Sequence, residues 1–380
     1  MKKFLAASLA LLSSVLFAPG TLAEETVKVG AILAVTGPAS FLGSPEARTL
    51  EMMVADLNAK GGLNGKKVVL VVKDSGASAE KAVSFAKQLI EEEKVIAIIG
   101  PSTSGETMAI KALAEESKTP LISCAAAEVI VNPLARYVFK TPQKDSQAVI
   151  RIYQQMKAMG LTKVAIFSSN TGFGKAGKEQ LEKLAPEYGI QVVLSEVYDS
   201  KATDLTAEVT KLKASNAQAV VNWSIEPAQA IVIKNVRQLG LTMPIFQSHG
   251  FGNIGYVKAA GAAAEGVIFP AGRLLIADQL PASNPQKKVL VAYKSEYEGK
   301  FKEDVSTFGG HGYDAMLLFA EAYKKGGTDR AKLRDALETL TGVVGTAGIF
   351  NMSATDHNGL GLDAFEMLTV KDGRFVPLAR

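Results

Sequence analysis

The chain is poor in the residues that build disulfides, metal sites and many active sites. Its 380 residues include one cysteine, Cys124, and three histidines, which lie far apart at positions 249, 311 and 357. An intrachain disulfide is therefore impossible, and neither a cysteine zinc site nor an H-E-x-x-H motif is present. A G-x-S-x-G nucleophile elbow is also missing, which removes the usual sequence signal of a hydrolase. We expect no metal, no cofactor and no catalysis.

Neither sign of charge predominates. The sequence has 42 basic and 38 acidic residues, and they are scattered along its length. Binding to nucleic acid requires a basic block or a basic and aromatic stripe that can neutralise a row of phosphates. Since no such feature occurs, we expect no nucleic-acid partner.

Long hydrophobic runs are scarce, and the one near the start is followed by a cleavage signal. Lys2 and Lys3 precede an apolar run from Phe4 to Phe17, and the small-residue exit ends at Ala23. This order predicts a secretory signal peptide, residues 1–23, cleaved after Ala23. A membrane-spanning helix needs about 20 apolar residues, and no later run is that long. We therefore expect export without membrane insertion.

After residue 23 the sequence alternates Val/Ile-rich runs with longer amphipathic segments, which predicts an α/β fold with parallel sheets. About 357 residues are too many for one compact core, so we expect two domains. The first set of predicted strands is Val27–Ala34, Lys67–Lys73, Val95–Gly100 and Pro120–Ser123, with helices at Glu46–Lys60, Ala79–Glu92 and Gly105–Ser117. The second set of strands is Lys163–Ser168, Gln191–Tyr198, Ala219–Asn222, Pro244–Gln247 and Gly266–Pro270, with helices at Asp145–Met159, Lys175–Ala185, Leu205–Ala214 and Pro227–Leu239.

These two sets predict two Rossmann-like lobes joined by a three-segment hinge. Three later helical segments carry no strands, so we expect them to pack on the sheet of the first lobe: Gln286–Phe301, Tyr313–Lys325 and Asp329–Leu340. Closing strands are predicted at Gly348–Phe350, Ala364–Val370 and Phe375–Pro377. The predicted lobes are 24–142 with 272–345, and 143–271 with 346–380. A hinged cleft between lobes is a common ligand site.

A glycine-rich turn offers the one motif for an enzyme. Gly172, Gly174 and Gly177 form a G-x-G-x-x-G that follows a predicted strand, opens a helix and has Glu196 about twenty residues further on. This is the context of a dinucleotide fingerprint, so an exported NAD-dependent dehydrogenase is an alternative. Any tight strand-to-helix turn also needs glycine, which is the simpler interpretation.

A Ser/Thr turn gives a sharper indication of a binding site. A buried strand ends at Gly100 and leads through Ser102, Thr103 and Ser104 into a helix. Free N–H groups at a helix start, with hydroxyls beside them, suit a carboxylate, although a plain N-cap explains the same residues. Small residues, Ala125 to Ala127, follow the next strand, and parallel sheets bind ligands beyond the carboxyl ends of their strands.

Several motifs together carry a family resemblance. They are Val29-Gly30-Ala31, Thr36-Gly37-Pro38, Asp56 to Gly65 with its Asn-Ala-Lys-Gly-Gly-Leu-Asn-Gly stretch, Ile98-Ile99-Gly100, Phe173-Gly174, Gly240-Leu241 and Glu265-Gly266-Val267. With these the chain resembles the type I periplasmic binding proteins of the Leu/Ile/Val-binding family over essentially all of its length after the signal peptide. The resemblance implies a monomeric, bilobal clamshell in the periplasm that delivers a small ligand to the membrane permease of an ABC importer.

The resemblance also implies site residues. The family's carboxylate site falls on Ser104, with backbone from Ser102 and Ala125, and a position that is commonly Thr is Ala127. On the second lobe, amino-acid binders place an acid against the ligand's ammonium, whereas this sequence has His249. A further ammonium-side position, typically Tyr, falls on Ile225.

These departures favour a carboxylate ligand without an α-ammonium, because an enclosed ammonium that lacks acceptors would lose its hydration. Aromatic or aryl-keto acids fit best, with Phe41, Phe173 and Trp223 as ring contacts. The segment from Phe308 to Asp314, which contains Tyr313, is similar to the branch of the family that takes up aromatic carboxylates. The alternative is a branched-chain amino acid whose ammonium is held by Glu226 or another acid.

Overall fold

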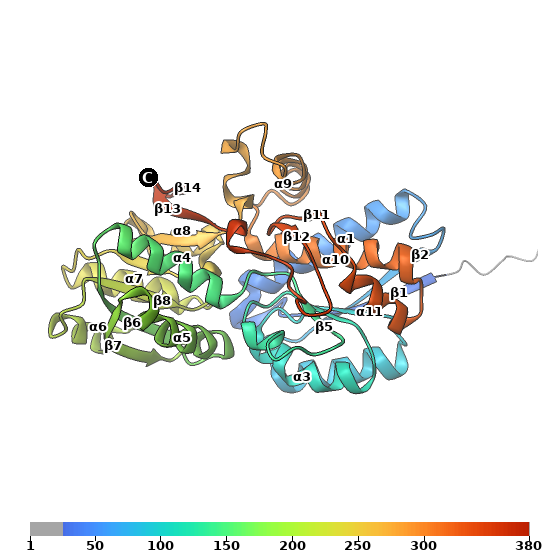
Figure 1. Cartoon of the computed structure of the whole chain (residues 1–380), viewed down its shortest axis with the longest axis horizontal. Helices are drawn as coiled ribbons and strands as arrows, with labels where there is room; N and C mark the ends of the chain where they lie inside the picture. The colour runs from blue at the N-terminus through green and yellow to red at the C-terminus, as the bar shows by residue number, and fades with distance from the viewer. Residues whose placement is uncertain (1–25, 380) are drawn as a thin grey trace, which may run out of the picture.

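Two separate β-sheets organise the chain (Figure 1). The computed structural model describes residues 26–379, so the predicted signal peptide 1–23 lies outside the described residues. The first sheet has the strand order β2-β1-β3-β4-β5 and is parallel throughout. Its strands are β1 (Thr26–Leu33), β2 (Lys67–Asp74), β3 (Ile98–Ile99), β4 (Leu121–Ser123) and β5 (Val138–Lys140).

The second sheet has seven strands in the order β14-β13-β10-β9-β8-β6-β7. It is parallel from β7 to β10, and β13 and β14 continue it as antiparallel strands at one edge. The strands are β6 (Lys163–Ser169), β7 (Gln191–Tyr198), β8 (Ala219–Trp223), β9 (Ile245–Gln247), β10 (Ile268–Ala271), β13 (Glu366–Lys371) and β14 (Arg374–Pro377). The predicted two-lobed α/β fold is confirmed.

Helices connect the parallel strands, as parallel pairing requires. The first lobe has α1 (Ser40–Ala59), α2 (Ala79–Lys87) and α3 (Ser104–Glu116), and the second has α4 (Asp145–Ala158), α5 (Gly172–Leu184), α6 (Thr206–Thr210), α7 (Ala228–Gln238) and α8 (Ile254–Ala260). Three helices follow β10: α9 (Lys287–Phe301), α10 (Thr307–Gly326) and α11 (Arg330–Glu338). As predicted, α10 and α11 pack on the first lobe, where Phe319 and Leu333 share a core with Val29 of β1 (Figure 1). Helix α9 packs on the connector Arg273–Gln279 and reaches α1 through a 2.8 Å hydrogen bond between Tyr293 and Thr49.

The return from the first lobe to the second differs from the prediction. Residues Ile349–Phe350 form β12, which pairs with β11 (Val343–Val344) and does not join the second sheet. The strand predicted at Gly348–Phe350 is therefore present, but its antiparallel partner lies only a few residues upstream and not in the second sheet. Phe350 and Ala364 are buried in the core of the first lobe. We propose that the third crossing lies nearer to β13 than to residue 345.

Close packing explains why residues 172, 174 and 177 of the fingerprint-like turn are glycines. A Cβ atom on Gly174 would overlap the carbonyl of Ser169, and one on Gly177 would overlap the indole ring of Trp223. Gly172 is the first residue of α5 and lies against Gly105 of the other lobe. Close packing is sufficient to account for all three glycines, so the motif by itself no longer favours the dehydrogenase alternative.

The contact between Gly177 and Trp223 can be tested by Gly177→Ala. The added methyl must displace a fully buried indole, so we expect a loss of about 1–3 kcal/mol in the free energy of unfolding. The matched control is Gly299→Ala on α9, where a Cβ meets nothing within 4 Å and alanine should stabilise by about 0.5–1 kcal/mol. Urea unfolding measures both, and an unchanged midpoint for Gly177→Ala would contradict the packing argument.

Candidate ligand-binding site

The carboxyl ends of both sheets lead into one buried cavity between the lobes. Its wall combines the start of α3, the residues after β4, the start of α5, the loops after β8 and β9, and the start of α10. The cavity volume is about 20 Å³, roughly the space that one water molecule needs. The lining residues are Leu42, Ser102, Ser104, Cys124, Ala125, Ala126, Pro142, Phe173, Ile225, His249, Gly250, Phe308 and His311.

The start of α3 supplies hydrogen-bond donors on the wall of the first lobe. Thr103 caps the helix, since its hydroxyl oxygen accepts from the N–H of Glu106 at 3.4 Å and its O–H donates to the Glu106 carboxylate at 2.6 Å. The first N–H groups of a helix have no acceptor inside the helix, and here they belong to Ser104 and Gly105. The Ser104 hydroxyl oxygen accepts from the Ala127 N–H at 3.2 Å, which leaves its proton for a ligand.

Ser102 is held by the protein itself. Its hydroxyl oxygen accepts from the Ala34 N–H at 3.0 Å, and its proton goes to the buried carboxyl group of Glu46. Burial raises the pKa of Glu46 well above its ordinary value, and the Ser102 hydrogen bond opposes that shift. The N–H of Ala125 is also used, by Ser123 at 3.1 Å. On this wall the Ser104 hydroxyl and the helix start are the groups best able to meet a ligand.

His249 forms the facing wall and lies in a box of aromatic rings. The rings of Phe173, Trp223 and Phe365 surround it edge-on, with centroids 5.4, 5.5 and 5.8 Å away. Neither ring nitrogen has a hydrogen-bond partner among residues 26–379, and the side chain of Asp145 lies 3.8 Å from Nε2. Burial lowers the pKa of His249 well below its ordinary value, so the ring is neutral at pH 7.

His311, near the start of α10, is a second neutral histidine at the cavity. It is 6 % exposed, and its Nδ1 atom has no hydrogen-bond partner in the described part of the chain. Burial, with a smaller contribution from the charge of Lys140, lowers the pKa of His311 to about 3. The sequence indicates a family resemblance for the segment from Phe308 to Asp314, but no pattern in it predicts that the His311 side chain lines the cavity.

A buried pair of opposite charges lies behind the cavity wall. The ammonium group of Lys140, at the end of β5, donates to the carbonyls of Ala126 and Gln143, the latter at 3.1 Å. Asp145, the first residue of α4, accepts from the N–H of Glu128 at 3.2 Å. Burial lowers the pKa of Lys140 and raises that of Asp145, and each charge partly offsets the shift of the other.

The structure brings six of the eleven predicted site residues to the cavity: Ser102, Ser104, Ala125, Phe173, Ile225 and His249. The other five are Thr103, Ala127, Trp223, Phe41 and Tyr313, which lie outside the cavity lining. Trp223 supports His249 from behind, and Ala127 binds Ser104 through its N–H. Phe41 packs on Tyr256 of the second lobe, with ring centroids 5.1 Å apart. Tyr313 faces Tyr293 of α9, also at 5.1 Å.

Two further observations bear on the class of protein. Among residues 26–379, no three His, Cys, Asp or Glu side chains are grouped so that they would hold a metal ion. None of the helices in the same range combines the length and apolar character that crossing a bilayer would need.

Comparison with known proteins decides the family. A family model described as periplasmic binding protein matches residues 26–374. The chain belongs to the periplasmic binding protein family. The predicted resemblance to its Leu/Ile/Val-binding members is confirmed by the relatives that follow.

Named relatives of this periplasmic binding protein are distant. A "Leu/Ile/Val-binding protein homolog 7" from Brucella suis is 27 % identical over 242 residues, which cover 61 % of this chain and 60 % of the relative. The match thus spans about three fifths of that relative's length. An extracellular ligand-binding receptor from Rhodopseudomonas palustris HaA2 has a TM-score of 0.87 and 27 % identity, covering 93 % of this chain and 99 % of that one. A branched-chain amino acid transporter substrate binding protein from Streptococcus pneumoniae, in complex with isoleucine, has a TM-score of 0.80 and 25 % identity, covering 92 % and 98 %.

The lowered pKa of His311 predicts a pH-dependent stability of this periplasmic binding protein. Histidine in an unfolded chain has a pKa of about 6.5, whereas the pKa of folded His311 is about 3. Between these values the unfolded chain binds a proton that the folded chain does not, so stability falls as the pH drops below about 6.5. The free energy of unfolding of the wild type should fall between about pH 7 and about pH 5. The same change in pH should lower that of His311→Gln by ~2 kcal/mol less. Urea unfolding at both pH values measures this, and identical losses would rule the effect out.

Proposed function

We propose that this chain is the periplasmic receptor of an ABC importer and binds a small carboxylate that carries no α-ammonium, an aromatic or aryl-keto acid, by closure of its two lobes. The composition of the cavity wall is the observation that carries this proposal. None of its thirteen lining residues is acidic. An ammonium enclosed there would lose its water shell and would face no negative charge, which would cost about several kcal/mol.

The donors at the cavity suit a carboxylate. The N-terminus of α3 and that of α5 meet beside it, since Ser104 and Phe173 both line the wall. A helix N-terminus carries a partial positive charge and free N–H groups, so two of them favour an anion between the lobes. The neutral rings of His249 and His311 can each donate or accept a hydrogen bond toward a keto or hydroxyl oxygen. Apolar side chains between these ends, Leu42, Ile225 and Phe308, suit a ring.

The small cavity supports a closure mechanism. A ring-bearing acid is far larger than the space of about 20 Å³ between the lobes, so entry requires that the lobes part. The lobes then close as far as the bound ring allows, water leaves, and polar contacts strengthen in the less polar surroundings. A permease could then distinguish the closed receptor from the open one, because ligand shifts the population toward closure.

A branched-chain amino acid is the second candidate, and the relatives' names favour it. The Brucella and Streptococcus proteins are named for such ligands. Glu226, the acid that the sequence offers for the ammonium, does not line the cavity, because its carboxylate accepts from the Ser224 hydroxyl at 2.6 Å. Asp145 fits better, since one of its oxygens has no hydrogen-bond partner and lies near His249. Lys140 offsets that negative charge, which makes the site less suited to an ammonium.

A thermal-shift panel separates the two ligand classes. It compares leucine, isoleucine and valine with benzoate, 4-hydroxybenzoate, coumarate and phenylpyruvate. A ligand present at about 100 times its Kd stabilises the folded protein by about 2.7 kcal/mol, so a true ligand raises the unfolding temperature clearly. We expect at least one aromatic or aryl-keto acid to do so and the amino acids not to. Stabilisation by leucine alone would establish the second candidate.

Single substitutions locate the site. Ser104→Ala removes the hydroxyl proton of the carboxylate wall, and His249→Ala removes the facing ring, so each should weaken binding by about 1–3 kcal/mol. The matched control is Ser117→Ala at the other end of α3, whose hydroxyl donates to the Leu113 carbonyl at 2.7 Å far from the cavity. Titration calorimetry with the stabilising ligand measures all three. Unchanged affinity in both site variants would exclude this cavity.

A further inference from the structure

The two lobes touch backbone to backbone at the rim of the cavity. Gly105 is the second residue of α3, and Gly172 is the first residue of α5. A Cβ atom on Gly172 would lie 3.0 Å from the N atom and 3.1 Å from the Cα atom of Gly105, with the carbonyl carbon of Ser104 at 3.6 Å. All three nearest atoms belong to the opposite lobe. The absence of a side chain at residue 172 therefore permits this approach.

The relation is not symmetric. A Cβ atom on Gly105 would meet nothing within 4 Å, so that position tolerates alanine with the lobes together. Neither glycine has the left-handed backbone conformation that disfavours other residues. Only the approach of the other lobe restricts the side chain at residue 172.

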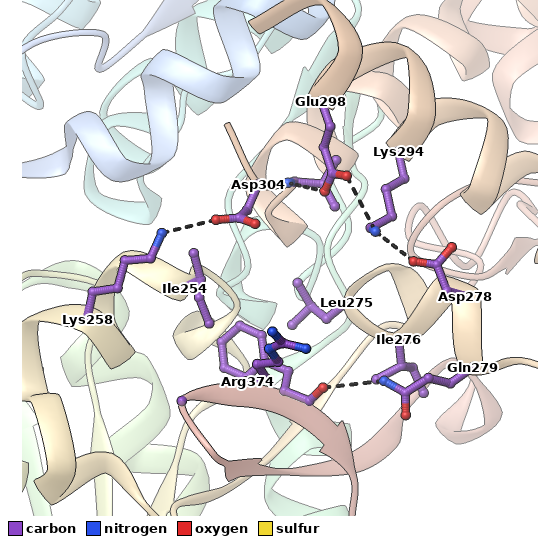
Figure 2. A pocket seen from close by; sticks show the side chains of 13 residues that line it. Ile254, Lys258, Leu275, Ile276, Asp278, Gln279, Lys294, Glu298, Asp304 and Arg374 are labelled. Atoms are coloured by element: carbon purple, nitrogen blue, oxygen red, sulfur yellow. Dashed lines mark hydrogen bonds and ion pairs between the residues drawn. The ribbon is translucent and has the colours of Figure 1, made fainter. Parts of the chain in front are cut away.

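Two contacts of α8 with the first-lobe side can adjust when the lobes move. Figure 2 shows Lys258 of α8 paired at 3.1 Å with Asp304, which lies between α9 and α10 at the edge of a surface groove of about 530 Å³. Both side chains are more than half exposed, and an exposed pair contributes little. Gly255 of α8 lies against the ring of Phe41, a side chain that can rotate. Backbone at the Gly172 contact cannot move aside in the same way.

We propose that glycine at residue 172 sets how far the lobes close and, through closure, the affinity for ligand. This inference rests on the proposed function, because it assumes that ligand is held by closure. A Cβ atom at residue 172 would push the N-termini of α3 and α5 apart by a few tenths of an ångström, and a branched side chain would push them further. The walls that carry Ser104 and His249 would then not reach the ligand together. A smaller closed population lowers the apparent affinity in proportion.

The test compares Gly172→Ala and Gly172→Val with the control Gly105→Ala. Spin labels at Glu116→Cys on α3 and Glu179→Cys on α5, both exposed positions, report the distance between the lobes. Because Cys124 lines the cavity between the lobes and opening would expose it, both labels are introduced in a Cys124→Ala background. Distances are measured without ligand and with 4-hydroxybenzoate or leucine, whichever binds the wild type, and affinity is measured by calorimetry.

We expect Gly172→Val to lose most of the short-distance population and to bind about tenfold more weakly, with Gly172→Ala intermediate and Gly105→Ala like the wild type. The ligand-free unfolding midpoint should not change, which separates lost closure from damaged folding. Wild-type distances and affinity in Gly172→Val would overturn the proposal. If none of the aromatic and aryl-keto acids of the thermal-shift panel binds the wild type, the proposed ligand class fails, and the ligand-free distances of Gly172→Val and wild type still decide the role of residue 172.

Discussion

The arrangement of the cavity depends on one constraint, which is that polar groups are removed from water there with few partners in the protein. Both ring nitrogens of His249, Nδ1 of His311 and one oxygen of Asp145 are buried without a hydrogen bond in the described chain. Burial without a partner costs roughly 1–3 kcal/mol for each group. The touching lobes are thus under a penalty. In the proposed function, a ligand with matching oxygens would relieve it, which would couple binding to closure.

The segments after the first two predicted crossings are tied to residues 345–347. Gln143, just after the first crossing, donates to the Ala347 carbonyl at 2.8 Å, and Gln286, after the second, donates to the Gly345 carbonyl at 2.9 Å. The hydroxyl of Thr141 donates to the His311 carbonyl at 3.1 Å. Side-chain amides thus link residues 143 and 286, which follow the first two predicted crossings, to the segment 345–347. The hydrogen bond from Thr141 also holds the backbone of His311, which lines the cavity.

The sequence predicts the lobes well because strand and helix periods alternate regularly. It misses elements where tertiary packing overrides local signals. The predicted helix at Tyr313–Lys325 begins at Thr307 in the structure, since Gly309 and Gly312 disfavour a helix locally yet allow α10 to lie close to α1. Helix α1 likewise begins at Ser40 and includes Pro45. No strand is predicted at Val138–Lys140, which is too short to show a period.

The site residues divide in the same way, into those that local sequence patterns predict and those that only the tertiary fold brings to the site. Ser104 and His249 follow strand ends, so the strand-turn-helix pattern and the family resemblance both point to them. His311 lines the cavity from the start of α10. Lys140 and Asp145 lie behind its wall, on an unpredicted strand and at the start of α4. No local pattern marks them, because their roles arise only when the chain has crossed between the lobes. Phe41 and Tyr313 show the converse, since aromatic character alone does not tell which ring faces a ligand.

The position of Cys124 has a consequence if the protein works in the periplasm, as proposed. A single thiol in an oxidising compartment can join two molecules covalently. Here it lies in the wall between the lobes, 2 % exposed, and burial raises the pKa of the Cys124 thiol well above its ordinary value. Oxidants react with the thiolate, so the shut receptor keeps its sulfur inert. Occupancy by cargo would thereby also protect the molecule from unwanted crosslinks.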